Sequence, residues 1–62
     1  MTIQGAFDKA VARAMRTGEE WVILWDPTIF DMPARQAYHI ARLDDFEQET
    51  FYYASKLIKV VG

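Results

Sequence analysis

The stretch GEEWVILWDP at residues 18–27 decides how this chain folds. Residues 21–25 within it are all apolar, so a strand here presents two tryptophans and an isoleucine on one face and a valine and a leucine on the other. Apolar side chains on both faces are typical of a strand that is covered on both sides. Because Pro27 cannot continue a hydrogen-bonded ladder, the pattern predicts a central strand from Glu20 to Trp25.

The segment before this strand has the pattern of an amphipathic helix. Thr2 is a suitable N-cap, and Gly18 is well placed to end the helix in a left-handed conformation. We therefore predict a helix from about Thr2 to Thr17. Its apolar residues recur at spacings of three and four, which is typical of a single buried stripe: Ile3, Phe7, Ala10, Val11, Ala14 and Met15.

The segment after the strand, residues 28–62, allows two interpretations. At a period of 3.6 residues, alanines and Tyr38 form a stripe that fits a helix from Met32 to Leu43. That helix would leave only a C-terminal strand to pair with the central one. At a period of two, residues 38–43 alternate as a strand, and the tail is dense in β-favouring residues. A helix capped at Asp45 is the alternative for the tail.

A single strand needs neighbours, which favours the strand interpretation. We predict strands at Tyr38–Leu43 and Phe51–Val61, joined by an acidic loop at Asp44–Thr50, with at most a helical turn at Ala34–Ala37. The sequence therefore predicts one α+β domain over residues 1–62. In it, an N-terminal amphipathic helix packs on a small, three-stranded antiparallel sheet.

Composition excludes several classes of protein. The 62 residues contain no cysteine and one histidine, which removes disulfides, thiolate metal sites and multi-histidine sites. No apolar run approaches the roughly 20 residues that span a bilayer. The net charge of −2 gives no strong attraction to nucleic acid or membrane. We expect a cytoplasmic protein with no cofactor, no metal and no membrane association.

Two groups of polar residues begin a catalytic or metal-binding pattern without completing it. Carboxylates at alternate positions from Asp45 resemble the start of a calcium loop, but the sixth position is Thr50 instead of glycine and the twelfth is Lys56 instead of glutamate. His39 has no orienting residue nearby in sequence, and Ser55 lacks the flanking glycines of a nucleophile elbow. The sequence therefore predicts a protein that is not an enzyme.

Aromatic residues are the most informative group. Two tryptophans, three tyrosines and four phenylalanines exceed what so small a core can enclose. Tryptophan and tyrosine are enriched at interface hot spots. We predict that an outer aromatic sheet face binds a second copy, as a homodimer, or a larger protein, with a phage- or plasmid-type inhibitor or modulator of a host protein as the concrete form. The candidate partner-binding residues are Trp21, Trp25, Tyr38, Tyr52 and Tyr53.

Basic residues support an alternative function. Cations on one side of the predicted first helix, together with nearby aromatic residues, are typical of proteins that bind a phosphate backbone. Exposed cations are equally common on helices that are merely solvated. The alternative is therefore a nucleic-acid-binding accessory protein that uses Lys9, Arg13, Arg16, Arg35 and Arg42.

Overall fold

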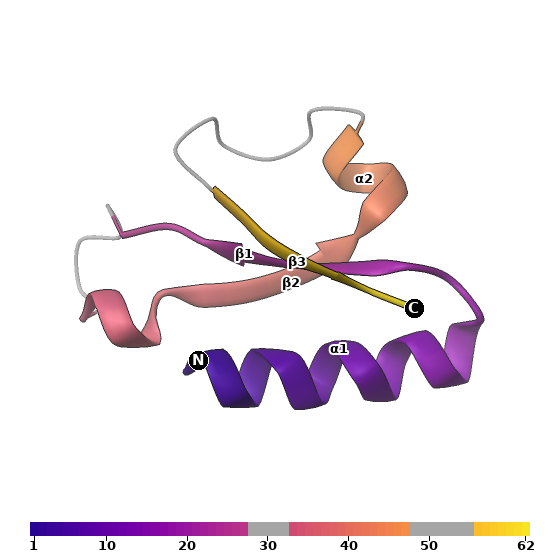
Figure 1. Cartoon of the computed structure of the whole chain (residues 1–62), viewed down its shortest axis with the longest axis horizontal. Coiled ribbons are helices and arrows are strands. Elements are labelled where there is room, and N and C mark those ends of the chain that lie inside the picture. Colours follow the sequence, from indigo (N-terminus) through magenta and orange to yellow (C-terminus); the bar gives the residue numbers. More distant parts are fainter. Residues whose placement is uncertain (28–32, 48–55) are drawn as a thin grey trace.

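A helix packed on a three-stranded antiparallel sheet forms the fold of the computed structural model (Figure 1), which describes residues 1–27, 33–47 and 56–62. The α+β fold predicted from the sequence is confirmed. The elements in chain order are α1 (Ile3–Thr17), β1 (Trp21–Trp25), a 3-10 turn (Ala34–Gln36), β2 (Tyr38–Arg42), α2 (Leu43–Glu47) and β3 (Lys56–Val61).

The sheet has the order β2-β1-β3, with β1 in the centre and antiparallel to both neighbours. Val22, Ile23 and Leu24 of β1 are at most 1% exposed. The all-apolar stretch thus forms the covered central strand that its sequence predicts. The register of β1 on β3 is Trp21–Val61, Val22–Val60, Ile23–Lys59, Leu24–Leu57 and Trp25–Lys56, with an irregularity between Ile23 and Leu24.

Local signals at both ends define α1. The Thr2 hydroxyl accepts a hydrogen bond of 3.1 Å from the Gly5 amide, which satisfies one of the free N–H groups of the first turn. Gly18 ends the helix in the left-handed region at φ 72°, and its amide donates to the Ala14 carbonyl. The residues that α1 buries completely are small, Ala6 and Ala10.

Two helices lie on opposite faces of the sheet (Figure 1). On the α1 side, Ala6 and Ala10 pack with Trp21 and Ile23. On the α2 side, Val22, Leu24 and Ala41 form a second cluster, against which Leu43 and Phe46 pack. The alternation along β1 therefore divides Trp21, Val22, Ile23 and Leu24 between two cores.

Some predicted boundaries are wrong. The segment that follows β2 is not a loop from its start, because Leu43–Glu47 forms α2. A helix over 32–43 is also wrong, since 38–42 is a strand. The predicted third strand is seen from Lys56 onward, and its first part, 51–55, lies outside the described residues.

The physical reason for the first error lies in tertiary packing. Leu43 and Phe46, three residues apart, both reach the α2-side core only if the chain turns as a helix. The acidic residues between them face away from that core.

Among the residues that the structure describes, no helix has the length and apolar character needed to cross a bilayer.

Candidate protein interface

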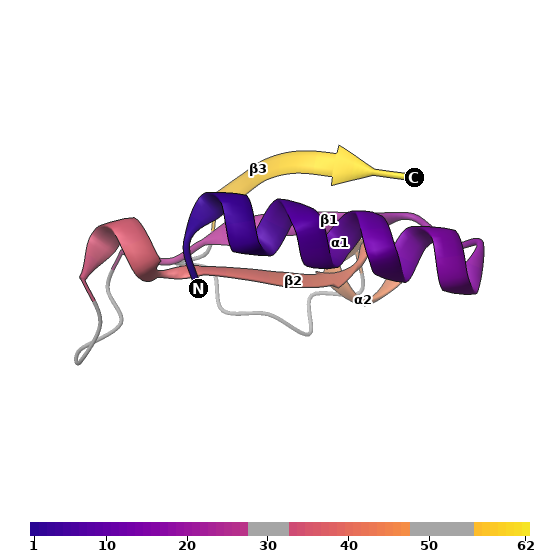
Figure 2. The same cartoon turned by 90° about the horizontal axis from the view of Figure 1, so that it is seen from below.

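The edge strand β3 carries exposed apolar side chains. Within the described part of the chain it pairs with β1 alone. Leu57, Ile58 and Val60 are 45, 43 and 39% exposed. Figure 2 shows β3 along one edge of the sheet, with α1 lying across the sheet beside it. Because an unpaired strand edge is a template for another strand, β3 is the candidate interface.

A β-bulge at Ile58 determines which way the side chains of β3 point. The residues before and after it, Leu57 and Lys59, lie opposite consecutive residues of β1, so Ile58 is the extra one. Without the bulge, Leu57 and Val60 would point to opposite faces of the sheet. With it, both lie opposite β1 residues of the α2-side core. The bulge thus gathers two apolar side chains on one face of an edge strand.

The lysines of β3 lie on the other face, toward α1. The Lys59 ammonium lies 5.0 Å from the centre of the Phe7 ring, and the Lys56 ammonium lies 5.9 Å from the Trp25 ring. Both distances are within the range of cation–π attraction. The strand therefore presents Leu57 and Val60 on one face, and the two lysines together with the half-buried Val61 on the other.

The opposite edge of the sheet is partly occupied by the chain itself. The Tyr38 amide of β2 donates to the Met1 carbonyl over 3.2 Å. The Met1 amino group donates to the Gln36 carbonyl over 2.7 Å and to the Tyr38 carbonyl over 3.3 Å. The start of β2 thus has backbone partners on its outer side, whereas β3 has none among the described residues.

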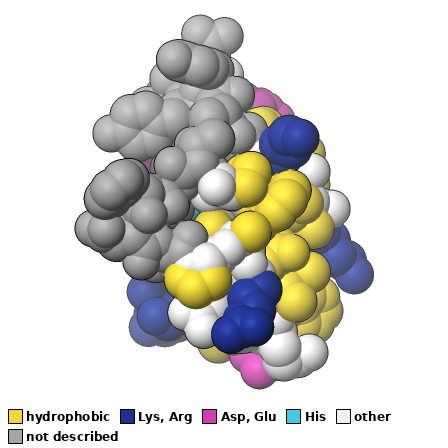
Figure 3. Space-filling model, turned by 90° about the vertical axis from the view of Figure 1, so that its left-hand side faces the viewer, with side chains coloured by type: hydrophobic (Ala, Val, Ile, Leu, Met, Phe, Trp, Pro, Cys, Tyr) yellow, Lys and Arg dark blue, Asp and Glu magenta, His cyan; other side chains and the backbone are white. Residues whose placement is uncertain are grey.

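Two half-buried aromatic rings lie beside the first residue of β3. Trp25 and Tyr38 stack with their ring centres 6.1 Å apart and their planes 25° apart. The Trp25 indole N–H donates to the Ala34 carbonyl over 2.7 Å, which fixes the ring. Figure 3 shows hydrophobic side chains gathered at this end of the molecule, with Lys and Arg side chains at the margin. These rings lie on the α1 face of the sheet, opposite to the face that carries Leu57 and Val60.

The predicted partner-binding aromatic residues lie in different environments. Trp21 is 8% exposed in the α1-side core, and its indole N–H donates to the Thr17 hydroxyl over 3.1 Å. The register puts Trp25 and Tyr38 on that same α1 face, not on the outer one. Tyr52 and Tyr53 lie outside the described residues. Binding of a protein by Trp25 and Tyr38 stays a prediction.

Sequence reasoning missed Leu57, Ile58 and Val60 as site residues. The signal was present, since KLIKVV at residues 56–61 has apolar residues at positions of both parities and would be covered on both faces if it were central. The sequence does not determine the order of the strands in the sheet. These apolar side chains are exposed because the segment forms an edge strand and not a central one.

The predicted basic residues do not form one surface. Arg13 stacks over the Trp21 ring, 5.4 Å from its centre, and Arg42 makes ion pairs of 3.3 Å with Glu19 and with Asp45. The hydrogen bond to Asp45 raises the pKa of Arg42 above its usual value, so it stays cationic within this ion-pair cluster. Lys9, Arg16 and Arg35 are exposed, the first two on α1 and the third in the 3-10 turn before β2.

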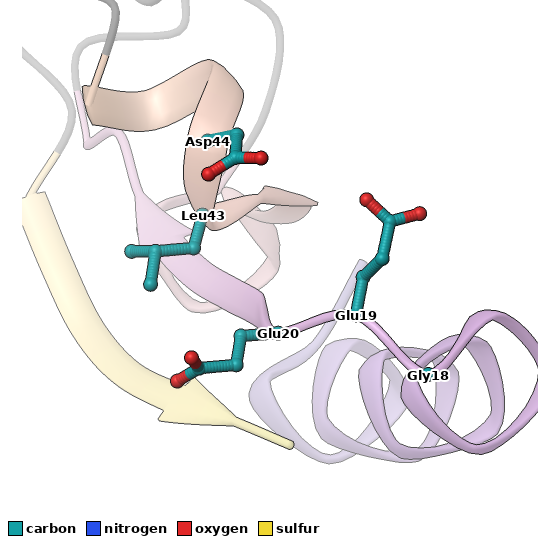
Figure 4. A pocket seen from close by; sticks show the side chains of 5 residues that line it. All are labelled: Gly18, Glu19, Glu20, Leu43 and Asp44. Carbon is teal, nitrogen blue, oxygen red and sulfur yellow. The ribbon is translucent and has the colours of Figure 1, made fainter.

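A hollow of about 250 Å³ lies between the turn that joins α1 to β1 and the start of α2 (Figure 4). Its acidic side chains point apart: Glu19 extends away from Glu20, whose carboxylate points toward the end of β3. Arg42 neutralises Glu19. Within residues 1–27, 33–47 and 56–62 no group of three His, Asp or Glu side chains is arranged to hold a metal ion. The lining residues are Gly18, Glu19, Glu20, Leu43 and Asp44.

His39 gives the stability of the fold a pH dependence. Burial in β2 lowers the pKa of His39 below 6.5, although the negative charge of Asp26 acts in the opposite direction. The folded state therefore prefers the neutral imidazole. The preference for neutral His39 contributes fully to the stability of the fold above pH 6.5. This contribution is lost as the pH falls through the lowered pKa, because the unfolded chain binds the proton more readily.

We expect the free energy of unfolding to fall between pH 7.5 and 5.5, and to fall less in His39→Asn. Urea denaturation at several pH values, followed by circular dichroism, measures the two slopes. Equal slopes for the two proteins would show that His39 is not the group responsible.

Comparisons of the chain with models of known protein families, with curated proteins and with solved structures find no match.

Proposed function

We propose that this chain is a non-catalytic protein-binding module that binds through the exposed edge strand β3. One observation carries the proposal: Leu57, Ile58 and Val60 are all exposed on a strand whose outer edge has no partner among the described residues. Backbone hydrogen bonds along such an edge give affinity, and apolar side chains beside it give selectivity.

The arrangement of charge supports protein over nucleic acid as the bound molecule. A phosphate-binding surface needs several free cations that act together. Of the cations predicted for that role, Arg13 lies on Trp21 and Arg42 is held by two carboxylates. The surface around β3 instead combines apolar side chains, two lysines and a stacked aromatic pair.

A photo-crosslinking residue at position 58 tests the proposal. We expect ultraviolet light to link position 58 to a protein in a lysate of the source organism, and unlabelled wild-type chain to compete for the link. Chain carrying Ile58→Lys should not compete, because a lysine there places a charge in the apolar contact. The matched control has the crosslinker at Met15, which is 82% exposed on α1 and not on β3.

Two results would contradict the proposal. One is equal crosslinking from positions 58 and 15. The other is loss of the crosslink in Lys9→Glu/Arg16→Glu together with steep weakening by salt, which would indicate phosphate binding. These two side chains are both exposed on α1, so their reversal leaves the Arg13–Trp21 contact of the core intact.

A further inference from the structure

We propose that the β3 edge binds an extended segment of another protein in which acidic and apolar residues alternate. Its acidic side chains meet the two lysines of β3, and its apolar side chains meet Leu57 and Val60. This inference rests on the proposed function and names the chemistry of the partner. When a strand adds to a sheet, backbone hydrogen bonds give affinity and the side chains that lie opposite each other give selectivity. The side chains on each face of β3 therefore determine which segment it accepts.

The α1 face of β3 carries two positive charges. Lys56 lies opposite Trp25 and Lys59 opposite Ile23, so the two lysines share a face and lie two positions apart along β1. Both lysines are exposed. Neither makes an ion pair within the described part of the chain, where the ion pairs belong to Arg42. This face therefore offers two cations without a carboxylate partner to a segment that adds beside it.

Aromatic rings hold these two ammonium groups on the α1 face. The Lys59 ammonium lies 5.0 Å from the centre of the Phe7 ring, and that of Lys56 lies 5.9 Å from the Trp25 ring. Because the rings already restrict the two flexible side chains, pairing with a carboxylate costs less conformational entropy. The Glu20 carboxylate points toward the end of β3 but belongs by alternation to the α2 face, so it does not neutralise them (Figure 4).

The α2 face of β3 sets the second requirement. Leu57 and Val60 lie there, 45 and 39% exposed, opposite the buried Leu24 and Val22. A segment that adds to β3 continues the sheet, and its side chains alternate between the same two faces. Side chains directly opposite each other share a face. Acidic residues opposite the two lysines are therefore two residues apart, and the residues between and beside them cover Leu57 and Val60 if they are apolar.

The lysines also exclude other segments. Lysine on an open edge discourages strand addition. A purely apolar segment would desolvate the ammonium groups without pairing them, and a basic segment would place like charges opposite each other. A second copy of β3 is itself basic, so it is disfavoured for the same reason. Carboxylates at alternate positions remove both costs, and the charges thus give specificity by penalising the wrong partners.

Three peptides of about ten residues test the charge and the alternation separately. The first alternates glutamate and valine, and the second alternates lysine and valine. The third has the composition of the first in the repeating order Glu-Glu-Val-Val, which places glutamate on both faces. Fluorescence anisotropy of the labelled peptides at physiological salt gives the dissociation constants. We expect a value on the order of 100 µM for the first peptide and at least about tenfold weaker binding of the other two.

Reversal of the lysine charges should reverse the preference. In Lys56→Glu/Lys59→Glu we expect the lysine–valine peptide to bind at least about fivefold more tightly than the glutamate–valine peptide. The matched control, Lys9→Glu/Arg16→Glu, makes the same change in net charge on exposed residues of α1 and should keep the wild-type order. Amide chemical shifts of the wild-type chain should change most along β3 when the first peptide is added. Far-ultraviolet circular dichroism confirms that each variant is folded.

Several outcomes would overturn the acidic segment as the partner. They are no binding of the glutamate–valine peptide at about 1 mM, equal binding of the three peptides, or a reversed preference in the α1 control as well. A wild-type dimer that Ile58→Lys dissociates in sedimentation would make a second copy the occupant instead. If one of these results is found while position 58 still crosslinks to a different protein, the acidic partner is wrong and the protein-binding function stands. Equal crosslinking from positions 58 and 15 contradicts the proposed function, whatever the peptides show.

Discussion

Leu24→Ala is expected to remove about half of the stability of the fold. Leu24 is completely buried in the central strand, in the core on the α2 side. Truncation of a buried leucine costs about 2–5 kcal/mol, from lost burial and from the cavity that remains. A chain of 62 residues has a total stability on the order of 3–9 kcal/mol. One substitution therefore removes much of the stability of the fold.

The same change at Leu57 is the matched control. Leu57 lies directly opposite Leu24 in the sheet but is 45% exposed, so Leu57→Ala should cost less than about 1 kcal/mol. Thermal denaturation of the two variants and of wild type at one protein concentration gives both values. We expect Tm to fall by at least about 10 °C in Leu24→Ala and by only a few degrees in Leu57→Ala. Similar losses would mean that the exposed edge is covered in solution.

Ala10→Leu is the second substitution with a large expected effect. Ala10 of α1 is 0% exposed, and its side chain packs against the face of β1 that carries Trp21 and Ile23. The extra carbon atoms of leucine have no space there, so α1 must move away from the sheet. Overpacking of this kind costs about 1–3 kcal/mol. We expect a fall in Tm of roughly 5–20 °C.

Ala12→Leu is the control on the same helix. Ala12 is exposed, and leucine is nearly as good a helix former as alanine. We expect its stability to stay within about 0.5 kcal/mol of wild type by urea denaturation. A loss as large as that of Ala10→Leu would show that helix propensity, and not close packing on the sheet, limits α1.

The predictable part of the fold is the part that local signals determine. Thr2, the apolar stripe and Gly18 define α1 without reference to any other element, and Pro27 follows the end of β1. The short helix α2 has no such signals, because LDDFE makes a single turn that is stabilised by packing against β1. Its acidic residues are as common in loops, so the sequence alone favoured a loop.

The candidate interface was harder to predict than the fold. Both faces of β1 are apolar, so its alternation does not say which face α1 covers. The helix covers the tryptophan face, where the Thr17 hydroxyl accepts from Trp21 and Arg13 lies over the same ring. Of the predicted outer aromatic face, Trp21, Trp25 and Tyr38 thus lie on the α1 side of the sheet. The exposed residues of β3 depend on strand order and on a bulge, both of which are tertiary properties.

The two edges of the sheet are unequally open to strand addition. The backbone of Met1 already uses the outward amide and carbonyl of Tyr38 at the start of β2. A strand that approaches the β2 edge must therefore displace Met1 at this position, whereas the outer edge of β3 has no backbone partner among the described residues. An extended segment of another protein is therefore expected to add at β3 in preference to β2.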